Sequence, residues 1–266
     1  MSRWNDGHRF EGRVAVVTGA GGTLGGAVAR ALGHEGASVA AGYRSSRSAA
    51  DEVVADIEGN GGTAHSDALD VTDDHSVGAF VAGVVERYGR VDILINAAGR
   101  LDEADTVRFD ALETAATRAL LEVDVLGTMR VCQAALPHMG ANGSGAIVNF
   151  SSTYGNGITP TNPINWVPVG YCTAKGAIRG FTASLARDVA PTIRVNALAP
   201  GPITGDWEGE WGISRENIDE AIAMNPLKRF GYPEEVAETA LFLASDGAGY
   251  ITGQVVHLDG GWVPAG

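Results

Sequence analysis

The sequence lacks features that would place it at a membrane, outside the cell or on nucleic acid. No apolar run approaches the length that spans a bilayer, and the start, MSRWNDGHRF, has no apolar signal-peptide core. Basic residues are few, with 19 Lys and Arg against 32 Asp and Glu and a formal net charge of -13, so a nucleic acid would be repelled. We therefore expect a cytoplasmic protein with no membrane and no nucleic-acid partner.

Cysteine is scarce as well. Cys132 and Cys172 form no CxxC pair and stand at no metal-ligand spacing, and the six histidines are scattered along the chain. These absences predict reduced thiols and no metal site.

Short β-branched runs alternate with longer segments of helical spacing along the chain. Runs without polar alternation are typical of buried parallel strands, and their alternation with helices predicts a doubly wound α/β sheet with helices on both faces. No linker, low-complexity tract or repeat divides the chain, so one domain over 1–266 is expected, with a flexible extension over about residues 1–10. The expected strands are 13–18, 37–42, 91–96, 145–151, 192–198 and 254–259, and the expected helices are 23–35, 46–58, 73–88, 109–138 and 170–189.

Two irregular stretches interrupt this alternation. Residues 153–169 hold three prolines and Trp166, and residues 200–213 are rich in glycine and hold Trp207 and Trp211. Both follow expected strands at their carboxyl ends, where ligands bind in open α/β sheets. We expect substrate loops at 153–169 and about 200–228, with the tryptophans lining an apolar or ring-shaped pocket; core or interface packing of these side chains is the alternative.

A glycine-rich turn joins the first expected strand to the first helix in VVTGAGGTLGGAVARAL (16–32). Glycines let the backbone approach a pyrophosphate, and the helix N-terminus offers unpaired N–H groups. The stretch resembles TGxxxGxG, the fingerprint of the short-chain dehydrogenases/reductases, with Thr18, Gly19 and Gly25 in place. Thr23 stands where the second glycine belongs, and its hydroxyl is expected to cap the helix or to contact a phosphate oxygen.

The end of the second expected strand, GYRSS (42–46), indicates which dinucleotide is preferred. An NAD site has a carboxylate there to hold the ribose 2′-hydroxyl, whereas this chain has Tyr43 followed by Arg44 and Ser45. A guanidinium beside serine hydroxyls suits a 2′-phosphate. The pattern therefore predicts NADP(H), with a merely solvated Arg44 as the alternative.

The resemblance extends over essentially the whole chain. Asp70 and Val71 resemble the family's adenine contact, INAAG (95–99) resembles its NNAG motif, and residues 229–261 are close to its C-terminal signature. The resemblance implies a Rossmann-type fold and a homo-oligomer, either dimer or tetramer. The cofactor contacts that it implies are Gly19, Thr23, Leu24, Gly25, Arg44, Ser45, Asp70, Val71, Asn96, Ala97, Tyr171, Lys175, Pro200, Gly201 and Ile203.

The segment YCTAK (171–175) places Tyr171 and Lys175 four residues apart, on one face of an expected helix. It resembles the family's catalytic Tyr and Lys, and NFSS (149–152) resembles the serine-bearing strand end, with Ser152 favoured over Ser151. The resemblance implies that Tyr171 exchanges a proton with a carbonyl oxygen to which Ser152 hydrogen-bonds. Lys175, aided by the positive nicotinamide of the oxidised cofactor, is expected to favour the phenolate, and Lys175 is also expected to hold the nicotinamide ribose.

Asp124, in LEVDVLG (121–127), stands where many relatives have a catalytic asparagine. An ionised carboxylate accepts hydrogen bonds but donates none. Activity is expected to survive because the resemblance implies a proton relay through the local backbone carbonyl and a water.

These residues predict an NADPH-dependent ketoreductase, similar to the 3-oxoacyl-carrier-protein reductases, acting on a small carbonyl or alcohol. An alcohol or sugar dehydrogenase working oxidatively is the alternative within enzymes, because the same groups serve both directions. A catalytically silent NADP-binding regulatory protein is the alternative outside them, favoured by Thr23 and Asp124.

Overall fold

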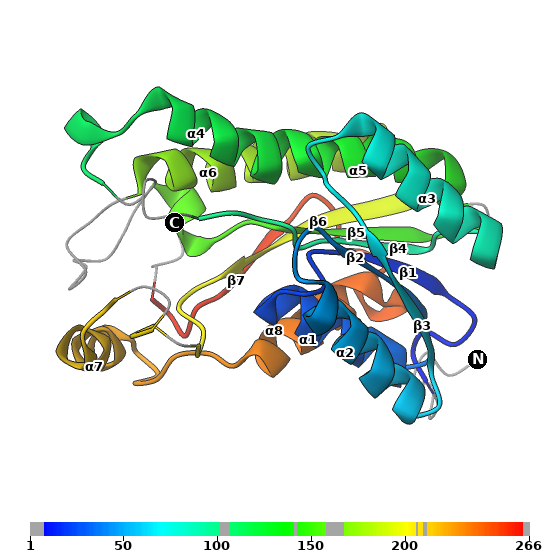
Figure 1. Cartoon of the computed structure of the whole chain (residues 1–266), viewed down its shortest axis with the longest axis horizontal. Coiled ribbons are helices and arrows are strands. Elements are labelled where there is room, and N and C mark those ends of the chain that lie inside the picture. The colour runs from blue at the N-terminus through cyan, green and yellow to red at the C-terminus, as the bar shows by residue number, and fades with distance from the viewer. Residues whose placement is uncertain are drawn as a thin grey trace.

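The fold is built on one sheet of seven parallel strands (Figure 1). The structure, a computed structural model, describes residues 8–101, 107–140, 143–157, 168–205, 207–209 and 212–262. The strand order is β3-β2-β1-β4-β5-β6-β7, so the direction of winding reverses between β1 and β4. The strands are β1 (Val14–Thr18), β2 (Ser38–Tyr43), β3 (Thr63–Ala68), β4 (Ile93–Asn96), β5 (Gly145–Phe150), β6 (Ile193–Pro200) and β7 (Val255–Leu258). The expected doubly wound α/β fold is confirmed.

The central strands are buried on both faces. Val16 of β1 pairs with Ala40 of β2 and Leu94 of β4, and every residue of β1, β4 and β5 is buried. This explains why they appear in the sequence as unbroken apolar runs. Strand β3 was absent from the expected strands because it is polar and lies at the sheet edge, where half of its residues are exposed.

Helices cover both faces of the sheet, as Figure 1 shows. On one side lie α1 (Thr23–His34), α2 (Arg47–Gly59) and α8 (Pro233–Ala244); on the other lie α3 (Asp74–Tyr88), α4 (Thr114–Leu121), α5 (Thr128–Ala135) and α6 (Val169–Asp188). Helix α7 (Arg215–Met224) stands apart from both layers. Neither α7 nor α8 was among the helices expected from the sequence.

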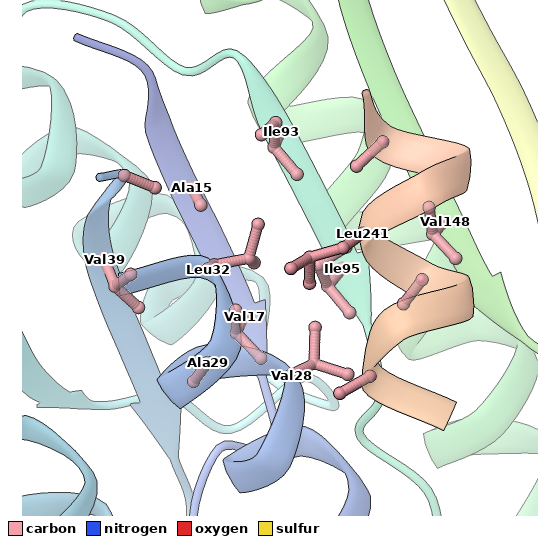
Figure 2. Close-up of a cluster of buried hydrophobic side chains, with 14 of the residues drawn as sticks. Ala15, Val17, Val28, Ala29, Leu32, Val39, Ile93, Ile95, Val148 and Leu241 are labelled. Atoms are coloured by element: carbon pink, nitrogen blue, oxygen red, sulfur yellow. The ribbon is translucent and has the colours of Figure 1, made fainter. Parts of the chain in front are cut away.

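The apolar core consists of two main clusters separated by the sheet. Successive strand residues point to opposite faces, so Ala15 and Val17 of β1 contact α1 and α8 (Figure 2), whereas Val14 and Val16 join the cluster beneath α3 and α5. Leu241 of α8 lies among the side chains drawn in Figure 2. Packing on both faces fixes the strand ends from which the candidate site is built.

The stretch expected to form one helix over 109–138 is divided. It contains the 3-10 turn Phe109–Ala111, then α4, a π-helical segment Glu122–Gly127, α5 and a second 3-10 turn, Leu136–His138. A Cβ at Gly127 would lie 2.6 Å from Val71 Cγ2, so glycine allows the π segment to approach the loop after β3. Two further 3-10 turns are Thr153–Asn156 and Asp246–Ala248.

The flexible extension expected over about 1–10 is wrong for its last three residues. Phe10 is fully buried, and Arg9 forms ion pairs of 3.0 Å with Glu35 and 3.1 Å with Glu238. The apolar ring and the guanidinium thus attach residues 8–10 to α1 and α8. Residues 1–7 lie outside the described residues.

Candidate active site

A cavity of about 490 Å³ opens at the carboxyl ends of β1, β4, β5 and β6. This is the place where the strand order predicts a ligand crevice. Twelve of the residues proposed from the sequence line it: Gly19, Thr23, Leu24, Gly25, Ala97, Asp124, Ser152, Tyr171, Lys175, Pro200, Gly201 and Ile203.

The glycine-rich turn forms one wall and depends on the absence of side chains. Gly19 has a φ of +67°, and a Cβ there would lie 2.9 Å from Ala98 Cα; a Cβ at Gly25 would lie 2.3 Å from the Gly19 carbonyl oxygen. Helix α1 begins at Thr23 after Gly22, and no side chain caps it. Its first-turn N–H groups therefore face the cavity region uncapped, which fits a pyrophosphate.

Thr23 does not cap the helix, contrary to one of the two roles expected for it. It is the first helical residue, and the N-cap position belongs to Gly22. A hydroxyl at that position lines the cavity instead, which leaves contact with a phosphate oxygen as its proposed role.

Asn96 lies beside the cavity but directs its side chain into the protein. Its Nδ2 donates to Asn149 Oδ1 at 2.9 Å and to Cys132 Sγ at 3.2 Å, and Asn149 in turn donates to Thr182 Oγ1. The amide thus links β4 to β5 and α5. A cofactor contact from Asn96 would have to come from its backbone.

The remaining predicted cofactor residues lie outside this cavity. Arg44 lines a second cavity of about 500 Å³, which shares Gly99, Arg100 and Leu101 with the first. Asp70 accepts hydrogen bonds from Thr72 Oγ1 and N, which lower the pKa of its carboxyl, with a smaller contribution from Arg44. Val71 is buried under Gly127, and Ser45 is exposed without lining either cavity.

The predicted catalytic residues meet at the start of α6. Lys175 Nζ lies 5.5 Å from the centre of the Tyr171 ring, and the Ser152 hydroxyl hydrogen-bonds to the phenol. Ser152 Oγ is held from the other side by the Tyr154 N–H at 3.2 Å. Ser151 instead donates its hydroxyl to the Lys175 carbonyl at 2.9 Å, so Ser152 is the serine that the structure brings to the phenol.

Asp124 forms a buried ion pair with Lys175, a contact that the sequence did not indicate. Lys175 Nζ lies 2.8 Å from Asp124 Oδ2 and donates to the Phe150 carbonyl at 3.1 Å. Asp124 Oδ1 accepts from the Arg100 main-chain N–H at 2.9 Å. The carboxylate and ammonium are both almost fully buried, so their positions are fixed by each other and by the backbone.

The protein's own groups raise the pKa of Tyr171 above its usual value. Burial has the largest effect, Lys175 and the Ser152 hydrogen bond act in the opposite direction, and the Asp124 carboxylate raises the pKa further. The ring is partly exposed to the cavity, yet protein surrounds the hydroxyl. Lys175 lowers the pKa of Tyr171 as expected, but among the protein's own groups burial and Asp124 outweigh it.

The pKa of Lys175 is also raised. Burial alone would lower it, but the Asp124 carboxylate and the Tyr171 phenol outweigh burial. At neutral pH the site therefore contains an ammonium and a neutral phenol.

Apolar side chains line the opposite wall of the cavity. Trp207 donates its Nε1–H to the Ile203 carbonyl at 2.7 Å, and its ring contacts Phe230 with centroids 5.3 Å apart. Ile213 and Trp262 complete this wall. Trp166 and Trp211 lie outside the described residues.

Sequence reasoning missed several cavity residues. Arg100 follows INAAG directly, and Phe230 and Trp262 lie within or directly after the C-terminal signature, so their neighbourhood was a usable signal. Tyr154, whose ring centroid is 6.2 Å from that of Tyr171, had no signal beyond its place in the expected loop.

Comparison with known proteins agrees with this arrangement. The family profile described as enoyl-(acyl carrier protein) reductase matches residues 19–263. The chain belongs to the short-chain dehydrogenase/reductase family. As a short-chain dehydrogenase/reductase it is an oxidoreductase that uses a nicotinamide cofactor.

Three similar proteins show how widely activities vary within the short-chain dehydrogenases/reductases. A 3-oxoacyl-(acyl-carrier-protein) reductase of Thermotoga maritima is 37% identical, covering 96% of this chain and 99% of its own. Glucose 1-dehydrogenase 2 of Bacillus subtilis is 35% identical, with 94% of each chain covered. A solved 7α-hydroxysteroid dehydrogenase, in complex with NADH and 7-oxoglycochenodeoxycholic acid, is 31% identical with a TM-score of 0.88, covering 98% of this chain and 99% of its own.

Two expected absences were also examined over the part of the chain that the structure describes. None of the described helices is long and apolar enough to cross a membrane. Among the same residues, no group of three or more His, Cys, Asp or Glu side chains is placed to hold a metal ion.

Proposed function

We propose that the protein is an NADP(H)-dependent oxidoreductase that interconverts a ketone and a secondary alcohol, with Tyr171 as its acid and base. The observation that carries this proposal is the meeting of Tyr171, Ser152 and Lys175 in one cavity with the uncapped N-terminus of α1. The first three supply proton-transfer chemistry, and the helix supplies an anion site.

The geometry suggests a role for each side chain. Ser152 donates a hydrogen bond to the carbonyl oxygen of the substrate, and Tyr171 donates its phenolic proton to the same oxygen. The nicotinamide cofactor supplies hydride to the carbonyl carbon or accepts it in reverse. Lys175 directs two of its three N–H groups to Asp124 and Phe150 among the described residues, so a third can bind a ribose hydroxyl.

The protein's own groups favour the form of Tyr171 that donates a proton in carbonyl reduction. Burial raises the pKa of Tyr171, so the neutral phenol, which is the donating form, predominates at neutral pH. An oxidative dehydrogenase, such as the glucose dehydrogenase relative, uses the same groups and is the alternative.

Replacement of Tyr171 by Phe tests the proposal because it removes only a hydroxyl. We expect turnover to fall roughly 100- to 10,000-fold, the range for loss of a general acid, while NADPH affinity measured by fluorescence stays unchanged. Tyr88→Phe is the control, since Tyr88 hydrogen-bonds to His65 away from the cavity. Retained reduction in Tyr171→Phe would place the acid elsewhere, and no NADPH oxidation by wild type with any of a panel of ketones would favour a silent binding protein.

Arg44 supports the preference for NADP(H). It is exposed, forms no hydrogen bond or ion pair with the described residues, and lines the cavity that adjoins the active site. We expect Arg44→Ala to lower kcat/KM for NADPH roughly 10- to 100-fold, because a charge-assisted hydrogen bond is lost, and to leave kcat/KM for NADH unchanged. Arg47→Ala, which removes an exposed arginine paired with Asp51, is the matched control. A wild-type preference for NADH would contradict the assignment.

A homo-oligomer is also proposed. Leu126, Met129, Phe242 and the fully exposed Tyr250 are large side chains that the protein leaves open to solvent. Exposed apolar side chains of this size favour association between copies of the chain. Light scattering coupled to size exclusion measures the oligomeric mass, and a monomer at micromolar concentration would contradict the proposal.

A further inference from the structure

We propose that Asp124 is a positioning residue that neutralises the charge of Lys175 beside Tyr171 and thereby keeps Tyr171 in its proton-donating form at neutral pH. This inference rests on the function proposed above and adds to it the residue that sets its pH dependence. Asp124 acts through Lys175 and needs no contact with substrate.

The Asp124 carboxylate cannot turn away from Lys175. Its Oδ2 lies 2.8 Å from Lys175 Nζ, and its Oδ1 is held by the Arg100 main-chain N–H at 2.9 Å. The π-helical segment around it is held as well, since the Asp124 carbonyl accepts the Thr128 hydroxyl at 2.8 Å. The pair is therefore a fixed feature of the cavity wall.

Among the described residues, Lys175 and Asp124 are the charged groups of opposite sign that act most strongly on the phenol of Tyr171. Because these two are paired, the charge they place beside the hydroxyl sums to zero, whereas an asparagine at 124 would leave a net positive charge. The polar and titratable groups that face the ring are Lys175 and Cys172 from α6, Asp124 from the π segment, Ser152 and Tyr154 after β5, and Arg100 of the same cavity after β4.

The two directions of the reaction require opposite forms of Tyr171. In reduction, hydride adds to the carbonyl carbon and the phenolic proton moves to the oxygen, leaving a phenolate that solvent reprotonates. In oxidation, a phenolate must accept the alcohol proton as hydride leaves the carbon. When Lys175 and Asp124 offset each other, the protein holds little phenolate at neutral pH, so the acidic limb of the pH profile for oxidation should lie above neutral pH.

Asp124→Asn is the decisive variant. We expect the acidic limb of the pH profile of kcat/KM for alcohol oxidation to move down by about one pH unit, while the ratio of oxidation to reduction at any one pH stays fixed by the equilibrium. Ketone reduction at neutral pH should change less than about threefold, within the context-dependence of a single substitution. Asp92→Asn is the matched control, because it removes another buried carboxylate, paired with Arg90 at the start of β4 and outside the cavity, and should leave the limb in place.

A second measurement is independent of turnover and of bound cofactor. Ultraviolet difference titration of wild type against Tyr171→Phe isolates the tyrosinate of Tyr171. We expect that tyrosinate to form above the ordinary tyrosine pKa of about 10 in wild type and at lower pH in Asp124→Asn. A wild-type Tyr171 that titrates well below 10 would overturn the inference even if Asp124→Asn failed to fold.

Asp124→Glu retains the negative charge and should keep the wild-type pH limb, which a merely structural role does not predict. If Tyr171→Phe abolishes turnover while Asp124→Asn moves neither the limb nor the tyrosinate titration, the inference is wrong and the proposed function stands. If Tyr171→Phe remains active, the proposed function is wrong whatever Asp124→Asn shows.

Discussion

The two walls of the cavity are built in different ways. The catalytic wall comes from β5, the π segment and α6, which pack into the main body of the fold, and its polar atoms are matched to one another at short distances. The opposite wall contains Trp207 and is called the substrate wall below. It packs against a separate apolar cluster of Ile213, Ile218, Ala221 and Phe230 at α7, outside the layers that cover the sheet.

This difference suggests how each wall responds to change. A buried ion pair leaves an uncompensated charge when one partner is removed, so stability is lost. Apolar contacts lose free energy in proportion to the area removed. The substrate wall can therefore vary without affecting the catalytic wall, which is the usual relation between a scaffold and specificity loops.

Replacement of Lys175 by Met should have the largest effect. It leaves Asp124 buried without a counter-charge, so we expect the free energy of unfolding to fall by about 3–5 kcal/mol and turnover to be lost. Urea unfolding and kcat give the two values. The double variant Asp124→Asn with Lys175→Met should recover most of the stability but none of the turnover; a stable Lys175→Met protein would show that the catalytic wall is not held by charge.

Replacement of Gly25 by Ala should have the next largest effect, because the new Cβ would lie 2.3 Å from the Gly19 carbonyl oxygen. The turn must open, at a cost of about 1–3 kcal/mol, and we expect NADP(H) affinity to fall at least about tenfold. Fluorescence titration measures the affinity. Gly83→Ala in α3 is the control, since its Cβ would meet nothing within 4 Å and should slightly increase stability. Unchanged affinity in Gly25→Ala would mean that the turn is not a tight phosphate site.

Much of the fold could be predicted from the sequence because the central strands are buried on both faces and therefore appear as apolar runs. The edge strand β3 has no such run, and its place depends on pairing with β2. Helix α8 was predictable, since Pro233 opens it and Glu235 bonds back to the Tyr232 N–H. The π segment was not, because its position depends on packing against α6 and the loop after β3.

The candidate site could likewise be predicted from the sequence only in part. The spacing of Tyr171 and Lys175 on one helix indicated that they would lie on one face, and the structure brings Ser152 to them. The ion pair between Asp124 and Lys175 joins segments far apart in the sequence, so no local pattern reveals it. The sequence therefore indicated the effect of Lys175 on Tyr171, but not the opposing effects of burial and Asp124, which raise its pKa.

Replacement of Trp207 by Ala tests the substrate wall. We expect KM for bulky apolar ketones to rise roughly tenfold, since part of a large apolar contact is lost, while KM for a small ketone and kcat change little. A panel of ketones of increasing size measures this dependence. Leu227→Ala, which removes a 62% exposed side chain that does not line the cavity, is the control. An unchanged KM profile in Trp207→Ala would make this ring a packing residue alone.

The smallest effect is expected for substitution of Glu235, which attaches the substrate wall to α8. Glu235 at the start of α8 receives hydrogen bonds from Arg229 at 2.6 and 2.7 Å and from the Tyr232 N–H at 2.8 Å, and it thereby holds the residues on either side of Phe230. The Arg229 bond is the main cause that lowers the pKa of Glu235 from 4.5 to about 2. Since the folded-state pKa is the lower one, its contribution to stability is full above pH 4.5 and is lost as pH falls toward 2.

Glu235→Gln should therefore lower Tm by about 2 °C at neutral pH, because the pair is largely exposed. The difference from wild type should become small as pH falls toward 2, where the wild-type carboxyl is half protonated. Thermal unfolding followed by circular dichroism across this range measures both values. Glu234→Gln removes the adjacent exposed carboxylate, which has no hydrogen bond or ion pair with the described residues, and should show no such pH-dependent difference. If Glu235→Gln also raises KM for bulky ketones without changing kcat, the attachment at α8 positions the substrate wall alone; a fall in kcat would show that the two walls are coupled.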